Sequence, residues 1–150
     1  MPNKPVTILM ADDDADDRLL TQEALEENPM AFNLHFVEDG EELMDYLLHR
    51  GKYTDPATCP RPNLILLDLN MPKKDGREAI KEIKAIPDLR RIPIIVLTTS
   101  HAEEDIMQTY DLGVSSYITK PVTFDALVNV TKIIGVYWFE TVKLPPVIKD

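Results

Sequence analysis

The chain has 150 residues, 44% of them apolar and 28% charged, which is the balance of one globular domain large enough to bury a core. Its formal net charge of −10 argues against nucleic acid and anionic membranes as partners, because sequence-independent binding to either needs clustered Lys and Arg. No apolar segment approaches the roughly 20 residues that cross a bilayer, and the N-terminus does not resemble a signal peptide. The single cysteine, Cys59, excludes an internal disulfide. We therefore expect a cytoplasmic protein.

Five apolar runs predict strands, and five amphipathic segments predict helices. In chain order we expect a strand at 6–11, a helix at 15–26, a strand at 34–37, a helix at 39–50, a loop at 51–62, a strand at 63–69, a helix at 77–86, a strand at 92–100, a helix at 103–112, a strand at 116–119 and a helix at 124–140. Asp14 and Asp39 are placed to cap two of these helices, and Gly113 is placed to end a third.

The alternation of strands and helices predicts the fold class. We expect an α/β fold of the flavodoxin-like (βα)5 type, with a doubly wound, parallel, five-stranded sheet. The nearly continuous apolar runs at 63–69 and 92–100 are typical of parallel strands buried on both faces. One domain is expected over residues 1–143, followed by a tail at 144–150.

Polar residues follow or end four of the predicted strands. Asp12 and Asp13 follow the first strand, Asp68 and Thr98 lie at the ends of the third and fourth, and Lys120 follows the fifth. Ligands of such sheets bind at the carboxyl ends of the strands, so these side chains are the candidate site. Two carboxylates about 4 Å apart repel by about 4 kcal/mol at an effective dielectric constant of about 20, so the cluster needs Lys120 and a divalent cation. Oxygen ligands of this kind suit Mg²⁺.

The other aspartates of the acidic run need no ligand role. Asp14, Asp16 and Asp17 lie at the start of the helix predicted at 15–26. The helix macrodipole stabilises a negative charge there by about 0.3–1 kcal/mol per residue. We therefore expect these three carboxylates only to stabilise the helix.

The segments "MADDD", "LILLDLNMPKKDG", "VLTTS" and "SYITKP", in this order, resemble the receiver domain of two-component response regulators, over roughly residues 6–140. The resemblance implies that Asp68 accepts a phosphoryl group from a sensor histidine kinase. It implies that Mg²⁺ is bound by Asp12, Asp13, Asp68 and the backbone carbonyl of Asn70. The expected protein is a signalling phosphoacceptor, whose only chemistry is phosphorylation from a donor and its own dephosphorylation, and not an enzyme.

The same resemblance implies roles for residues near the ends of the last two strands. Thr98 would donate a hydrogen bond to the phosphoryl oxygens, and Lys120 would form an ion pair with them. Tyr117 takes the position of a switch aromatic, which turns inward when Thr98 moves. Pro121 would follow Lys120 through a cis peptide. Thr99 stands where small residues are usual, at a position that faces the incoming donor.

A finer resemblance concerns the partner. The segments "RPNLILLDLNMPKKDGRE", "IPDLRRIPIIVLTTSHAEEDI" and "YWFETVKLP" are similar to the small response regulators that partner bacterial, notably cyanobacterial, phytochromes. A phytochrome is therefore the implied sensor kinase. Almost no sequence remains outside the receiver pattern, so we expect signalling by protein–protein contact, without an attached output domain.

The helix predicted at 124–140 has apolar residues on more than one face. One stripe would cover the sheet, and the remaining patch suggests a partner surface. We expect a homodimer formed through the last strand and this helix. In the alternative interpretation, the tail covers the patch within one chain.

Two other functions are weighed against the phosphoacceptor. A magnesium-dependent phosphohydrolase with an aspartyl nucleophile needs a second Asp two residues after the nucleophile as acid and base, and Asn70 stands there. A pseudo-receiver would be an interaction module that is never phosphorylated. The intact set of site residues argues against that function; it comprises Asp12, Asp13, Asp68, Thr98 and Lys120.

Overall fold

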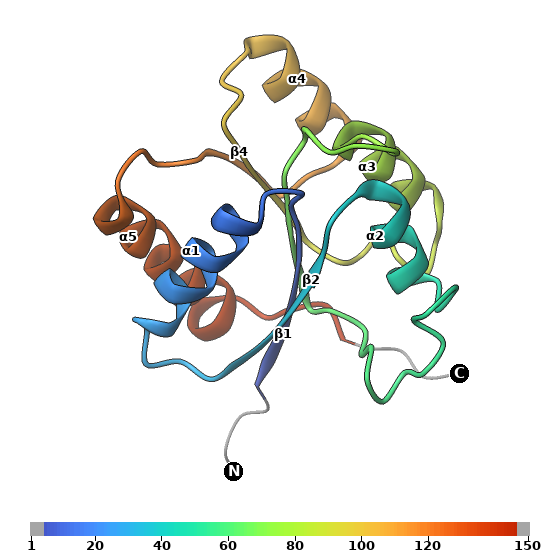
Figure 1. The fold of residues 1–150 in the computed structure, drawn as a ribbon, viewed down its shortest axis with the longest axis horizontal. Coiled ribbons are helices and arrows are strands. Elements are labelled where there is room, and N and C mark those ends of the chain that lie inside the picture. The colour runs from blue at the N-terminus through green and yellow to red at the C-terminus, as the bar shows by residue number, and fades with distance from the viewer. Residues whose placement is uncertain (1–4, 147–150) are drawn as a thin grey trace.

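The structure is a computed structural model that describes residues 5–146. Five parallel strands form one sheet in the order β2-β1-β3-β4-β5 (Figure 1). The strands are β1 (Val6–Ala11), β2 (Phe32–Val37), β3 (Leu64–Leu67), β4 (Ile94–Thr98) and β5 (Ser116–Thr119). The helices are α1 (Ala15–Glu26), α2 (Gly40–Leu47), α3 (Gly76–Ala85), α4 (Glu103–Leu112), α5 (Phe124–Gly135) and the π-helix η1 (Val136–Thr141). The predicted doubly wound, flavodoxin-like fold is confirmed.

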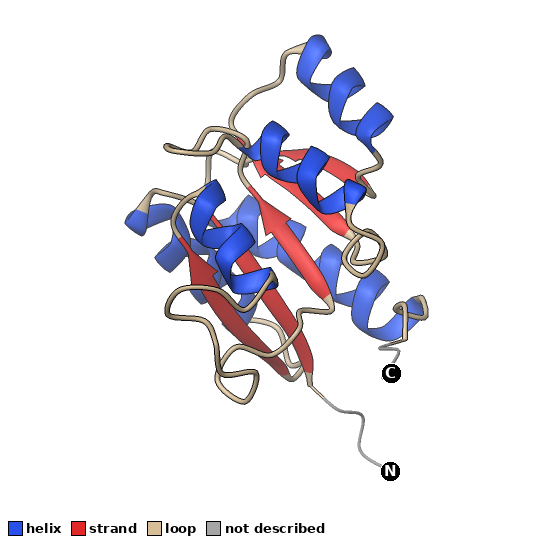
Figure 2. Ribbon diagram, turned by 90° about the vertical axis from the view of Figure 1, so that its right-hand side faces the viewer, coloured by secondary structure: helices blue, strands red, loops and turns tan. Residues whose placement is uncertain are grey.

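Helices cover both faces of the sheet (Figure 2). Helices α1 and α5 pack together on one face, and α2, α3 and α4 lie in succession on the other. Side chains of the central strands alternate between these layers, as the two-residue period of a strand requires. Ile8 and Met10 of β1 pack toward α1 and α5, beside Leu25 and Ile134. Leu9, between them, packs in the larger cluster beneath α2 and α3.

Local signals begin and end most of the helices. The Asp14 carboxylate accepts hydrogen bonds from the N–H groups of Asp16 and Asp17 at the start of α1, and Asp39 accepts from Glu42 N at the start of α2. Gly113 ends α4 with a φ of 106°, in the left-handed region that favours glycine. The predicted bounds of α1, α4 and β5 agree with the structure.

The end of the last helix differs from the prediction. The α-helix stops at Gly135 instead of continuing to Glu140, and the chain goes on as η1. A Cβ on Gly135 would lie 2.3 Å from Cε of Met30, so a larger residue at this position would require the flexible end of the Met30 side chain to move. The wider π turn rotates the side chains that follow, and Trp138 and Phe139 pack against the core beneath α1 and α5.

The described residues include no helix that is both long and apolar enough to span a membrane. Of the tail predicted at 144–150, residues 147–150 lie outside the described part of the chain. The carboxyl ends of all five parallel strands point to one edge of the sheet, and that edge holds the candidate site.

Candidate functional site

The predicted site residues meet at the carboxyl ends of β1, β3, β4 and β5. Asp12 follows β1 and Asp68 follows β3, and these two strands are neighbours in the sheet. Carboxylate oxygens of Asp12, Asp13 and Asp68 lie within 4.8 Å of one another. Lys120 follows β5 and donates from Nζ to Asp12 Oδ2 at 2.8 Å and to Asp68 Oδ2 at 3.0 Å.

Backbone hydrogen bonds hold the two buried carboxylates in place. Asp12 N donates to Val37 O at 3.1 Å, and Asp68 N donates to Ala11 O at 3.0 Å, so the sheet ladder continues through the first residue of each loop. Asp12 is fully buried and Asp68 nearly so, whereas Asp13 is exposed. Asn70 N donates to Asp68 Oδ1 at 3.2 Å, which leaves the two Asp68 oxygens bonded to different donors.

The charges of the cluster are only partly compensated. Burial raises the pKa of Asp12 above its ordinary value, although hydrogen bonds from Lys120 and from Asp14 N oppose this effect. Burial alone would lower the pKa of Lys120, but its bonds to Asp12 and Asp17 and the charge of Asp68 outweigh burial and raise that pKa. Lys120 is therefore a permanent cation among acidic groups that outnumber it.

The residues fit a hard divalent cation. Three carboxylates with oxygens close together, one of them on an exposed residue, are the oxygen ligands that Mg²⁺ takes while it keeps several waters. Burial raises the pKa of Asp12, and such a cation would offset the cost of burying this ionised carboxylate.

We expect MgCl2 to raise the melting temperature of the protein at pH 7. Above the folded-state pKa of Asp12 the ionised, buried carboxylate carries a constant free-energy cost, and a bound cation relieves it. Below that pKa the proton takes the place of the cation, so the effect shrinks as the pH falls. At 100 times its dissociation constant, the ion would add about 2.7 kcal/mol to the free energy of unfolding.

Thermal unfolding at pH 7 and near pH 4, with NaCl at matched ionic strength, measures this effect. Asp13→Asn removes the exposed carboxylate of the cluster and should reduce the magnesium-dependent shift. An equal shift from NaCl, or a shift that persists in acid, would argue against a specific cation site.

Thr98 ends β4, and Tyr117 lies in β5, the neighbouring strand of the sheet. Thr98 is fully buried, and its Oγ1 accepts a 3.4 Å hydrogen bond from Ser100 N. Tyr117 is half-buried and donates from its hydroxyl to Ser100 O at 2.8 Å, so its ring already lies against the β4–α4 loop. Lys120 N donates to Thr98 O at 2.7 Å, which joins the two strand ends directly. The Lys120–Pro121 peptide is trans, like every other bond in the described residues, and the expected cis form is wrong.

A second polar cluster fixes the same loop and was missing from the sequence analysis. Arg77 of α3 contacts Asp105 of α4 through Nε at 2.8 Å, and Ser100 Oγ donates to Asp105 Oδ2 at 2.6 Å. The Ser100 hydroxyl and the Arg77 guanidinium hold the pKa of Asp105 below its ordinary value. The loop that accepts the Tyr117 hydroxyl is thus tied to two helices.

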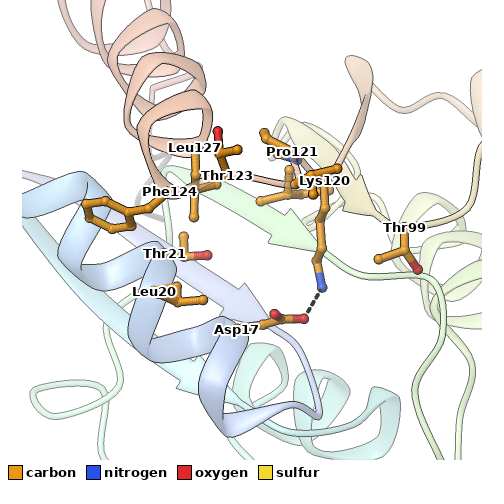
Figure 3. Close-up of a pocket in the computed structure, with 11 residues that line it drawn as sticks. Asp17, Leu20, Thr21, Thr99, Lys120, Pro121, Thr123, Phe124 and Leu127 are labelled. Carbon is orange, nitrogen blue, oxygen red and sulfur yellow. Dashed lines mark hydrogen bonds and ion pairs between the residues drawn. The ribbon is translucent and has the colours of Figure 1, made fainter.

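Asp17 has a role that the sequence analysis missed. Its Oδ2 lies 2.8 Å from Lys120 Nζ (Figure 3), so it is more than a favourable charge at a helix start. No local spacing could have indicated this contact, because Asp17 and Lys120 lie 103 positions apart in the chain and meet only through the packing of α1 on the sheet.

Residues 8–132 match the family described as response regulator receiver domain. Response regulator Rcp1 of Synechocystis sp. is 46% identical over 143 residues, which is 95% of each chain. The structure of the phosphorylated cyanobacterial phytochrome response regulator RcpA superimposes with a TM-score of 0.88, at 45% identity, over 95% of this chain and 100% of that one. The Mn²⁺-bound form of Rcp1 gives 0.86 at 46% identity, over the same shares of the two chains.

Proposed function

The chain belongs to the response regulator receiver domain family, and from this membership we propose that Asp68 is its phosphoacceptor in a two-component phosphorelay. One observation carries the assignment: Asp68 lies at the end of the central strand β3, and the Lys120 ammonium, Asp12 and Asp13 surround it. The family signals through phosphorylation, so the proposed protein is a switch and not an enzyme with an external substrate.

The transfer needs a nucleophile and compensation of charge. An Asp68 carboxylate oxygen forms a bond to phosphorus while the bond from phosphorus to the donor histidine nitrogen breaks. That nitrogen keeps the electron pair, and the product is an acyl phosphate on Asp68. Lys120 is within hydrogen-bond distance of Asp68, so its ammonium is placed to pair with the new phosphoryl oxygens.

Asp12, Asp13, Asp68 and the backbone carbonyl of Asn70 are the proposed ligands of Mg²⁺. When bound, the ion would neutralise charge on the phosphoryl oxygens and help to align them. Support comes from the close carboxylate oxygens of this chain and from the Mn²⁺-bound relative. The chain's own residues supply the nucleophile, the ammonium and the backbone N–H groups.

Thr98 and Tyr117 are the proposed readout. The phosphoryl oxygens would draw the Thr98 hydroxyl toward Asp68, and the β4–α4 loop would follow, since Ser100 N donates to that hydroxyl. Tyr117 donates to Ser100 O, so a shift of this loop changes the hydrogen bond that holds the ring. The switch would shift the population between two arrangements that differ by a few kcal/mol.

The proposed donor is a sensor histidine kinase of the phytochrome class. The response regulators Rcp1 and RcpA are 45–46% identical to this chain over 95% of its length, and RcpA is a cyanobacterial phytochrome response regulator. A regulator from R. palustris that acts in red light signaling is also similar, at 32% identity and a TM-score of 0.88. The same proposal includes a receiver unit over residues 1–143 and a cytoplasmic location. It includes no nucleic acid or membrane as a partner.

Phosphorylation assays test this function. Acetyl phosphate with MgCl2 should produce one hydroxylamine-labile phosphoryl group per chain, and a phosphorylated phytochrome kinase should transfer faster than a kinase from an unrelated sensor. The absence of any label would leave the pseudo-receiver as the better function. Label without a preference for the phytochrome kinase would refute only the proposed partner.

A homodimer through β5 and α5 is the proposed assembly. Ile133 and Tyr137 of this face remain 60% and 50% exposed, although Trp138 and Phe139 are half-buried within the chain. Strand β5 is an edge of the sheet, and Ile118 in it is only half-buried. Apolar groups left together in this way are typical of a surface that pairs with another chain.

Ile133→Asp should weaken such a dimer by at least about tenfold, because a charge would be buried at the interface. Met107→Asp is the matched control, since Met107 is 68% exposed on α4, outside the proposed interface. Light scattering of both variants and of the wild type, before and after phosphorylation, gives the mass. A wild-type monomer in both states would exclude the dimer.

A further inference from the structure

Lys120 has a third carboxylate partner outside the proposed magnesium ligands. Asp17, in the first turn of α1, accepts from Lys120 Nζ at 2.8 Å, the same distance as Asp12. Figure 3 shows the two side chains pointing toward each other at the edge of a pocket lined by α1, by the residues after β5 and by the start of α5. Thr99 lies on the far side of Lys120 in this view.

All the hydrogen-bond donors of this ammonium are in use. A lysine ammonium has three N–H groups, and Lys120 has three acceptors, which are Asp12, Asp17 and Asp68. A phosphoryl oxygen on Asp68 can therefore receive a hydrogen bond from Lys120 only if one of the present acceptors releases it.

Asp17 is the acceptor that can release Lys120 at the lowest cost. The Asp12 side chain is 0% exposed, so bulk water could not replace the ammonium as its hydrogen-bond donor. Asp68 becomes an uncharged acyl group when it carries the phosphoryl group, so the N–H that it now accepts can pass to a phosphoryl oxygen, and any second hydrogen bond from Lys120 must be released by Asp12 or Asp17. The Asp17 side chain is 35% exposed and lies at the pocket edge, so water can replace the ammonium as its partner.

We infer that Asp17 is a positioning residue, which holds Lys120 in the unphosphorylated protein and releases it when Asp68 is phosphorylated. The inference rests on the proposed function of Asp68. Asp17 competes with the phosphoryl group for the same ammonium, so it slows phosphorylation and shortens the lifetime of the acyl phosphate. Its negative charge thus disfavours the phosphorylated state, whereas that of Asp12 helps to hold the ammonium at the site.

The test compares Asp17→Asn with Asp16→Asn. Both residues lie in the first turn of α1 and both changes remove one negative charge, but Asp16 is exposed and has no bond to Lys120. With saturating MgCl2, the rate of phosphorylation is measured against acetyl phosphate concentration, and the decay of the acyl phosphate is then followed. The loss of one charge-assisted hydrogen bond predicts that Asp17→Asn raises the maximal rate and the lifetime by about threefold to tenfold.

The two kinetic parameters separate positioning from general charge. Removal of a surface charge near an anionic donor changes the half-saturating donor concentration, and Asp16→Asn should share that change. Only Asp17→Asn should change the maximal rate and the lifetime. Equal values of these two quantities in both variants, or a slower Asp17→Asn, would overturn the inference.

A measurement without metal or phosphoryl group tests the contact itself. In wild type, NMR should show the Lys120 ammonium hydrogens exchanging with water more slowly than those of the exposed Lys81. Asp17→Asn should accelerate this exchange, because a neutral amide accepts more weakly than a carboxylate, and Asp16→Asn should not. Unprotected hydrogens in wild type would contradict the inference even if Asp68 is phosphorylated, whereas a wild type that is never labelled would contradict the proposed function.

Discussion

Asp68→Asn is expected to abolish labelling by acetyl phosphate and by the kinase. The asparagine has nearly the same shape, but its amide oxygen is a poor nucleophile compared with a carboxylate oxygen. Asp68 is nearly buried and its backbone N–H continues the sheet ladder, so the substitution leaves the main-chain bonds intact. Labelling should fall to background, as measured by the mass of the intact protein.

Asp16→Asn serves as the control, since it removes a carboxylate from the same acidic run and should keep the label. Circular dichroism and a melting curve establish that both variants are folded. Persistent labelling of Asp68→Asn at Asp12, Asp13 or Asp17, located by peptide mass spectrometry, would refute the assignment of the acceptor.

Gly76→Ala is expected to destabilise the protein and to impair phosphorylation together. Gly76 begins α3 and donates to Leu69 O at 2.9 Å. A Cβ here would lie 2.6 Å from Asp68 O and 2.7 Å from Leu69 Cα, which are backbone atoms that cannot rotate away. The loop that carries Asp68 must therefore move.

Overpacking of this kind costs about 1–3 kcal/mol, and a chain of this size loses about 2–4 °C of melting temperature per kcal/mol. Displacing the nucleophile should also slow labelling about tenfold to a hundredfold. Denaturant titration measures the first effect, and the acetyl phosphate assay measures the second.

Gly51→Ala is the control for Gly76→Ala. Gly51 has a φ of 60° in the α2–β3 loop, and its Cβ would meet only Asp45 Oδ2 at 3.6 Å. That variant should lose about 1–2 kcal/mol through backbone strain alone, with unchanged labelling. If Gly76→Ala kept full labelling, the close packing of α3 against the Asp68 loop would not matter for the site.

The local sequence determined where most elements lie. The Asp14 and Asp39 caps and the Gly113 stop act over a few residues, so α1 and α4 have the predicted bounds. The last helix was predicted to run to Glu140, but it ends at Gly135. At Gly135 the helix packs against Met30, which is far away in the chain, and the chain continues as a π turn that the apolar pattern did not predict.

The site follows the same division. By itself, the sequence placed Asp12, Asp68 and Lys120 at one edge of a parallel sheet, because strand ends are visible as breaks in apolar runs and the topology follows from their alternation. Only the tertiary structure decided that Asp17 shares the Lys120 ammonium and that Arg77 holds Asp105. The first contact depends on the distance between α1 and the residues after β5, and the second on the distance between α3 and α4. Both distances are set by the packing of whole helices on the sheet and not by residues that are nearby in the sequence.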